Sequence, residues 1–309
     1  MAEPELHFVI SAPRSGSTWL TKSLNQHAEI FATEHRLFGE FCEVWQNNDG
    51  TTSPRITFDK YAEAFSVHYF FESLGLDRKS FQDSFVRSFA NFLVGFAGRR
   101  SGKKVIVDKI TPYPGTAELV VQKIRKLFPK SKIIQLVRDG RDVLTSGTFD
   151  WLLKDAQGTD RYRYFVDKEA GFELKRFFDD DVIRKWAENW LETIECFESS
   201  PADVVVSYES MKQDLAGELD RIAGAVGASP GNIESLEGLS FEQMSGRKEG
   251  DGSQPTAKAR KGVVGDWKSH FTRADGELFD SIAGKQLVSL GYEKDSSWVQ
   301  GLPLTLPGG

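Results

Sequence analysis

Short runs of apolar, β-branched residues recur along this chain, and each is separated from the next by a stretch with helical periodicity. The runs cover residues 8–10, 105–107, 133–137 and 204–206. They are continuously apolar and do not alternate, which is typical of strands covered on both faces in a parallel sheet. The sequence therefore predicts an α/β fold of three layers, with a central, mostly parallel sheet of about five strands flanked by helices. Helices are expected at about 17–27, 60–74, 80–97, 115–127, 141–153, 182–198, 211–226 and 274–289.

One domain accounts for most of the chain. With 309 residues, 39% of them hydrophobic, the chain can build one large core, and we expect a single domain over residues 1–295. Residues 154–181 lack a steady period and are expected to form either a lid or a solvated surface excursion. Residues 247–262 are rich in Gly, Lys and Arg and are expected to form a mobile loop, and residues 296–309 a C-terminal tail.

Charge and cysteine content narrow the class of partner. The net charge of -6 argues against a nucleic-acid binder, so a site for a multiply charged ligand must concentrate its Arg and Lys locally. Cys42 and Cys196 form neither a CxxC pair nor a Cys/His cluster, which argues against a disulfide framework and a zinc site. We expect a cytoplasmic protein without a membrane span, because no targeting segment and no long apolar stretch is present.

The first predicted strand runs directly into a turn of small residues, and a helical pattern begins straight after it. Such a turn exposes backbone N–H groups at the positive end of a helix, which makes Ser15, Gly16, Ser17 and Thr18 a candidate anion site. Arg14 adds a permanent charge with fork geometry. The segment lacks the GxxxxGK[ST] pattern and its lysine, so ATP is a poor candidate ligand. A purely structural turn is the alternative.

Two further basic segments are candidates for phosphate binding. Arg138 follows the strand at 133–137, and Ser146 lies about two helical turns inside the next helix, so both can reach one phosphate. The alternative is a surface cluster of Arg and Asp. In the string 260–268, two adjacent cations precede a glycine, a pattern that suits a terminal phosphate dianion. Its candidate residues are Arg260, Lys261 and Gly262.

Together these segments resemble the sulfotransferases that use 3′-phosphoadenosine 5′-phosphosulfate (PAPS). Residues 13–19 look like the family's 5′-phosphosulfate loop, and residues 260–268, RKGVVGDWK, are similar to its RKGxxGDWK signature. The resemblance spans roughly residues 6–290 and implies a P-loop-like fold, with PAPS as donor and 3′-phosphoadenosine 5′-phosphate (PAP) as product. It implies that Arg138, Ser146 and the Arg-Lys-Gly of 260–262 hold the 3′-phosphate.

The same resemblance implies an adenine pocket. In the family a tryptophan stacks on adenine, a tyrosine at a strand end approaches it and a phenylalanine packs there. The matching residues are Trp19, Tyr208 and Phe241, although Trp19 is also ordinary core material. Leu239 stands where the family has a threonine, so a hydrogen bond found elsewhere is expected to be absent.

The chemistry calls for cations and a base. Sulfuryl transfer resembles phosphoryl transfer in its loose, in-line transition state, so cations should meet the charged oxygens and a base should accept the acceptor's proton. Arg14 and Lys109 are the candidate cations, although Lys109 is also a candidate partner of Asp108. The family's usual histidine is missing after Lys109, and the segment around Glu34 resembles the base of other sulfotransferases. Glu34 is the candidate base, with His35 and Asp108 as alternatives.

Acceptor and assembly are less constrained. We expect a hydroxyl acceptor, either a small molecule or a carrier-tethered chain, and no metal, because Arg and Lys supply the positive charge. The family's dimerisation segment has Arg273 in place of a valine, which predicts a monomer or a weak homodimer.

Trp186 and Trp190 recur at helical spacing and are expected in the core. The competing functions are a P-loop kinase for a nucleotide or small alcohol, and a non-catalytic protein that binds adenosine phosphates. Candidates for an apolar acceptor pocket are Phe38, Phe41, Trp45, Phe65, Tyr69, Phe70 and Phe149.

Overall fold

The structure is a computed structural model, and it describes most of the chain. The described residues are 5–34, 44–46, 52–54, 77–155, 157–167, 175–251 and 261–306. The expected helix at 60–74, His35 and Arg260 lie outside these residues, as do all the proposed acceptor-pocket aromatics except Trp45 and Phe149. Phe149 is 4% exposed and belongs to the core.

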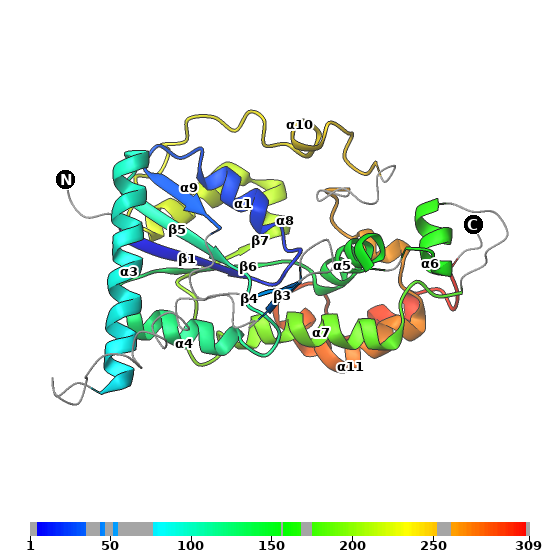
Figure 1. The fold of residues 1–309 in the computed structure, drawn as a ribbon. Coiled ribbons are helices and arrows are strands. Elements are labelled where there is room, and N and C mark those ends of the chain that lie inside the picture. The colour runs from blue at the N-terminus through cyan, green and yellow to red at the C-terminus, as the bar shows by residue number, and fades with distance from the viewer. Residues whose placement is uncertain are drawn as a thin grey trace.

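A parallel five-stranded sheet lies at the centre of the molecule, as the apolar runs predicted (Figure 1). Its strand order is β2-β5-β1-β6-β7, and every neighbouring pair is parallel. All residues of β5 and β6 are buried, which explains the apolar run at the start of β5 and the mostly apolar sequence of β6. The strands are β1 (Glu5–Ser11), β2 (Ile30–Thr33), β5 (Val105–Ile110), β6 (Ile133–Val137) and β7 (Val204–Ser207).

Two short strands form a separate antiparallel pair. They are β3 (Val44–Gln46) and β4 (Thr52–Pro54), and Trp45 pairs with Ser53 in their register. The sequence analysis predicted neither of them, and it did not identify β2 as a strand. Each of these strands has only three or four residues, too few to establish a periodic pattern.

The helices follow the predicted pattern, with some changes at their ends. The expected helix at 211–226 is two helices, because the first ends at Asp214. The Asp214 side chain then caps the second helix by accepting a hydrogen bond from the backbone N–H of Gly217. The long helices are α1 (Ser17–Leu24), α3 (Arg78–Ser101), α4 (Ala117–Leu127), α5 (Gly140–Asp155), α7 (Asp180–Glu195), α9 (Leu215–Ala225) and α11 (Arg273–Ser289). The shorter helical segments are α6 (Asp160–Tyr162), η2 (Arg163–Asp167), α8 (Tyr208–Gln213), α10 (Phe241–Ser245), η3 (Asp266–Ser269) and η4 (Ser296–Gly301).

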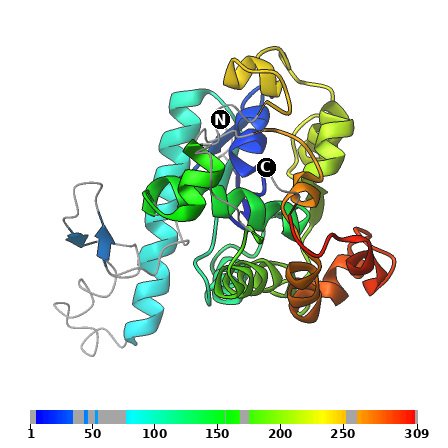
Figure 2. The ribbon, with the colours of Figure 1, turned by 90° about the vertical axis from the view of Figure 1, so that its right-hand side faces the viewer.

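Helices cover both faces of the sheet and complete the three layers. One apolar cluster joins α3 and α4 to one face of β1 and β5, and another joins α1 and α9 to the other face. A third cluster lies beyond the end of the sheet, where α5, α7 and α11 pack around Trp190, Phe271 and Phe279. Figure 2 shows α7 and α11 side by side in this cluster.

The interpretation of residues 296–309 as a tail is wrong for its described part, residues 296–306. Val299, Leu302 and Leu306 are each at most 9% exposed, and the indole of Trp298 packs edge-on against Trp267. Burial of these apolar side chains attaches the segment to α11 and η3. The expected lid is also packed in part, since Phe177 and Phe178 are buried in the same core. Movement of residues 154–181 as a lid stays a prediction.

A buried histidine makes the stability of this fold depend on pH. His7 in β1 is 2% exposed, and its Nδ1 accepts a hydrogen bond from the backbone N–H of Lys132 at 2.9 Å. Burial lowers its pKa from 6.5 to about 4, although nearby Glu5 opposes this shift. The unfolded chain therefore binds a proton in this pH range that the folded chain does not, so stability falls as pH falls from 6.5 toward 4.

We expect urea unfolding to show a loss on the order of 3 kcal/mol across this window. The variant His7→Asn keeps an acceptor oxygen near the Lys132 N–H and cannot take up a proton, so its stability should depend less on pH. If the free energy of unfolding of His7→Asn changed with pH as steeply as that of wild type, His7 would not be the cause of the pH dependence.

Candidate active site

The candidate residues gather at the carboxyl ends of the parallel strands, where open α/β sheets bind ligands. Arg14 follows β1, Glu34 follows β2, Lys109 lies near the end of β5, Arg138 follows β6 and Tyr208 follows β7. All five line one cavity of about 780 Å³. Also in its lining are Gly16, Ser17, Thr18, Trp19, Ser146, Phe241, Lys261 and Gly262. The structure therefore brings these sequence-predicted residues together.

The loop after β1 has the backbone geometry of an anion site. Gly16 precedes α1 with φ 89°, and no side chain caps the helix N-terminus. A Cβ on Gly16 would lie 2.5 Å from the Tyr208 ring, so only glycine fits. Among the described residues, Arg14 is the one non-glycine residue with positive φ, at 66°. Ser15 Oγ is buried and has no hydrogen-bond partner in the described part of the chain.

Arg14 lies at the centre of a small polar cluster. Its Nε donates to Ser146 Oγ at 3.1 Å, and its guanidinium is 3.6 Å from Asp150 Oδ1. Burial and the nearby Arg138 lower the pKa of Arg14, whereas Asp150 opposes the decrease. The guanidinium stays charged at neutral pH, since an arginine starts from a pKa above 12. An anion in the cavity would relieve the repulsion between the two arginines.

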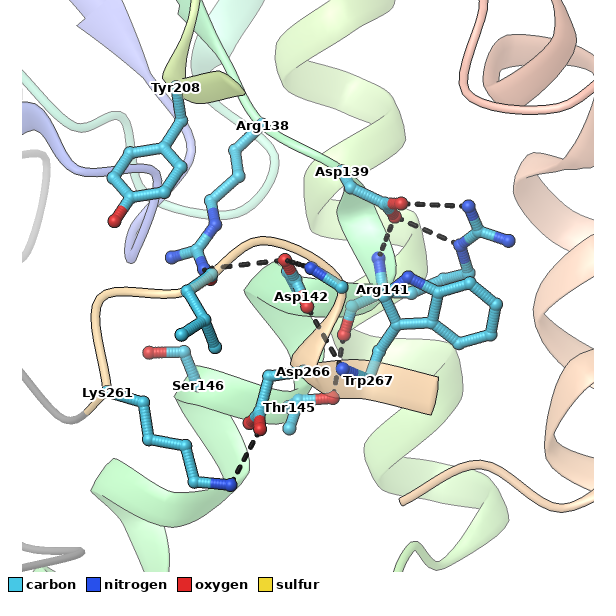
Figure 3. Close-up of polar contacts among 12 residues, drawn as sticks. Arg138, Asp139, Arg141, Asp142, Thr145, Ser146, Tyr208, Lys261, Asp266 and Trp267 are labelled. Carbon is cyan, nitrogen blue, oxygen red and sulfur yellow. Dashed lines mark hydrogen bonds and ion pairs between the residues drawn. The ribbon is translucent and has the colours of Figure 1, made fainter. Parts of the chain in front are cut away.

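Arg138 joins three of the candidate segments. Its guanidinium donates to the carbonyl of Arg14 at 3.2 Å and to the carbonyl of Val263 at 3.1 Å, and it stacks on the Tyr208 ring at 4.3 Å. Its Nε is buried without a hydrogen-bond partner among the described residues. Figure 3 shows Arg138 beside the Tyr208 ring, with Ser146 and Lys261 below them in this view. The orphaned Nε is a donor for a ligand oxygen.

The basic string near the C-terminus is fixed beside α5 by one buried carboxylate. Asp142 accepts hydrogen bonds from the backbone N–H groups of Gly265 and Trp267 at 2.8 and 3.0 Å (Figure 3). Burial raises the pKa of Asp142, and Arg138 opposes this shift from 3.5 Å away. Lys261 Nζ donates to Asp266 Oδ1 at 2.7 Å. This arrangement delivers Lys261 to the cavity.

Aromatic rings enclose the end of the cavity next to the basic string. The Tyr208 hydroxyl donates to the carbonyl of Gly262 at 3.0 Å, and burial raises the pKa of this tyrosine. Gly262 has φ 71°, and a Cβ there would lie 2.3 Å from the Phe241 ring. The Trp19 indole donates to the carbonyl of Leu239 at 3.0 Å and meets Tyr208 edge-on. The Leu239 backbone therefore helps to fix the indole of Trp19.

Glu34 and Lys109, the candidate base and one of the candidate cations, form an ion pair in the cavity. Strand pairing places Thr33 beside Asp108, so the residues that follow both reach the edge of the sheet. Lys109 Nζ is 3.4 Å from Glu34 Oε2, and their side chains are 7% and 34% exposed. The lysine is thus nearly enclosed while the carboxylate is open to the cavity. Asp108 is 1% exposed and is not part of the described cavity lining.

The sequence analysis missed one wall of the cavity. Pro112 and Tyr113 from the loop after β5 line it, together with Trp186 and Asn189 from α7. Trp186 was expected in the core. It contacts both the core and the cavity, because its ring packs on Gly147 of α5 and also lines the cavity. Trp190 is 1% exposed, so the core prediction is confirmed there. The one sequence signal for this wall was the polar residue Asn189 between Trp186 and Trp190.

Among the described residues, no group of three or more His, Cys, Asp or Glu side chains has the arrangement of a metal site. The described helices include none that is long and apolar enough to cross a membrane.

Fold and site together define a P-loop-like α/β protein with a candidate anion site at the carboxyl edge of its sheet. Comparison with known proteins gives the family: residues 4–291 match the sulfotransferase domain. The chain belongs to the sulfotransferase family.

Individual relatives agree with this assignment. The chain is 30% identical to mouse sulfotransferase 2A6 over 210 residues, which cover 61% of this chain and 68% of that protein. It is 30% identical to human sulfotransferase 2A1 over 190 residues, covering 54% of this chain and 62% of that one. Among solved structures, mouse sulfotransferase SULT7A1 complexed with PAP is similar in fold. Its TM-score is 0.50 at 17% identity, over 97% of this chain and 89% of that chain.

Proposed function

We propose that this protein transfers the sulfuryl group of PAPS to a hydroxyl group of an acceptor. The observation that carries the proposal is the convergence of Arg14, Arg138 and Lys261 on one cavity that also holds the Glu34 and Lys109 pair. These residues come from distant parts of the chain. Their convergence supplies a site for a doubly phosphorylated nucleotide next to a carboxylate.

The charge of the cavity lining fits such a donor. Acidic residues in the lining are Glu34 and Asp266, whereas the whole chain carries a net charge of -6. Positive charge is therefore concentrated locally, as the sequence analysis required of a polyanion site. The buried Nε of Arg138, a residue of the cavity lining, also needs an acceptor oxygen, which a phosphate group supplies. The cations in the lining are Arg14, Lys22, Lys109, Arg138, Lys185, Lys212, Arg247 and Lys261.

We assign roles to the residues as follows. Arg138, Ser146, Lys261 and Gly262 hold the 3′-phosphate, and Arg260, outside the described residues, completes that site. Residues 15–18 bind the 5′-phosphosulfate through the N-terminus of α1. Trp19, Tyr208 and Phe241 surround adenine.

Glu34 and Lys109 carry the reaction with Arg14. The acceptor oxygen attacks sulfur in line, and the bond from sulfur to the bridging oxygen of the 5′-phosphate breaks. Glu34 takes the acceptor's proton, so the products are a sulfate ester and PAP. Lys109 and Arg14 stabilise the negative charge that develops on the sulfuryl and leaving oxygens. The acceptor is a small molecule or a carrier-tethered chain, and the protein acts as a monomer or weak homodimer in the cytoplasm.

Thermal unfolding with nucleotides tests the donor site. A ligand at about 100 times its dissociation constant stabilises the folded state by about 2.7 kcal/mol. We expect that gain with PAP and much smaller gains with AMP and ATP at the same concentration. Equal gains with all three would contradict a site that recognises the 3′-phosphate. Product mass after incubation with PAPS and a panel of alcohols and phenols then separates an enzyme from a non-catalytic binding protein.

A further inference from the structure

Helix α7 supplies a rigid wall to the cavity. The six-membered ring of Trp186 packs against Gly147, where a Cβ would lie 2.2 Å from it. One turn further, the Trp190 indole donates to the carbonyl of Arg138 at 2.9 Å. These contacts fix the part of the helix that carries Asn189 against both α5 and the end of β6. Asn189 therefore reaches the cavity from a fixed backbone.

The loop that faces this wall is also attached to α7. Glu192 accepts hydrogen bonds from the backbone N–H groups of Gly115 and Ala117 at 2.6 and 2.8 Å. This carboxylate fixes the segment after β5, which brings Pro112 and Tyr113 into the cavity lining. The described wall is thus mainly apolar and aromatic, with Thr111 and Lys185 also in the lining, and Asn189 is its neutral amide.

The amide of Asn189 is the unexplained group in this wall. Asn189 is 9% exposed, and its Oδ1 has no hydrogen-bond partner in the described part of the chain. A buried amide without a partner is costly, and such groups are normally satisfied by protein, water or ligand. Rotation about the terminal side-chain bond exchanges the oxygen and the nitrogen, so the amide can offer an acceptor or a donor to the cavity. A hydroxyl group suits it, because a hydroxyl both donates and accepts.

We infer that Asn189 is a specificity residue that binds a second hydroxyl group of a flat, apolar acceptor. The first hydroxyl of the acceptor reacts beside Glu34 and Lys109, while its apolar body lies against Trp186, Pro112 and Tyr113. The inference rests on the proposed sulfuryl transfer and adds the class of acceptor to it. That class is an aromatic or similarly flat alcohol with a second hydroxyl away from the reacting one.

A matched pair of phenols tests the inference. The probes are 4-(2-hydroxyethyl)phenol and 4-ethylphenol, which differ by one hydroxyl group. We expect wild type to prefer the first by about tenfold or more in kcat/KM, because the analogue leaves the amide unpaired. In Asn189→Leu this preference should disappear through a higher KM for the hydroxylated probe, with 4-ethylphenol changed by less than about threefold.

A second substitution on α7 serves as the control, and separate results would overturn the inference and the proposed function. Glu188→Leu makes the same kind of change at an exposed position of α7 outside the cavity lining and should keep the preference. An equal loss with both probes in Asn189→Leu would indicate a merely structural residue and overturn the inference. So would a wild type that sulfates other acceptors without preferring the hydroxylated phenol. Failure to bind PAP or to sulfate any acceptor would instead contradict the proposed function.

Discussion

Replacing Glu34 with Gln is expected to lower kcat by about 10²–10⁴-fold, the usual contribution of a positioned general base. The amide keeps the shape of the side chain and can still contact Lys109, which lies 3.4 Å away in wild type. It cannot accept a proton at neutral pH. The loss should therefore appear in kcat, measured with PAPS and a saturating acceptor, while PAP binding stays close to that of wild type.

A second glutamate gives a matched control. Glu29 pairs with Lys104 at 2.8 Å near the opposite end of β2 and does not line the cavity. Glu29→Gln also removes a carboxylate from a lysine pair, so its kcat should stay near that of wild type. Near-normal turnover of Glu34→Gln with unchanged PAP binding would show that another group accepts the proton.

The sheet was predictable because β1, β5 and β6 are buried on both faces almost throughout, and β7 adds a short apolar run. Their apolar runs are visible in the sequence, and the polar residues that follow them mark the edge where ligands bind. Arg138 was found in this way, whereas Tyr208, which also directly follows a strand, was identified from the family resemblance. β2 escaped prediction because its four residues carry no periodic pattern, yet it delivers Glu34 to Lys109.

Other parts of the site depend on long-range packing. Asn189 lines the cavity because tryptophans on either side of it attach α7 to Gly147 and Arg138, and no local pattern encodes those contacts. The packed segment after Ser296 is similar, since its burial depends on α11 and on the contacts of Trp298 with the Trp267 ring and the Arg141 guanidinium. Composition alone made that segment look like a tail.

Removing the charges of Arg138 and Lys261 together is expected to lower affinity for PAP by about 10²–10⁴-fold. Each hydrogen bond from a charged group contributes about 1.5–3 kcal/mol, and about 1.4 kcal/mol corresponds to a tenfold change. The variant Arg138→Met with Lys261→Met keeps much of the side-chain volume. Binding measured by calorimetry should fall for PAP but change little for adenosine 5′-phosphosulfate, which lacks the 3′-phosphate.

The difference between these two ligands separates recognition from damage to the fold. Arg138 also holds the carbonyls of Arg14 and Val263, so its loss can disturb the cavity and weaken both ligands alike. Lys261→Met alone removes the ion pair with Asp266 and keeps Arg138 in place, so it should by itself weaken PAP selectively. Lys248→Met changes an exposed cation outside the cavity lining and should leave both affinities unchanged. Unaltered PAP affinity in the double variant would refute the 3′-phosphate site, because these two cations supply its positive charge within the described chain.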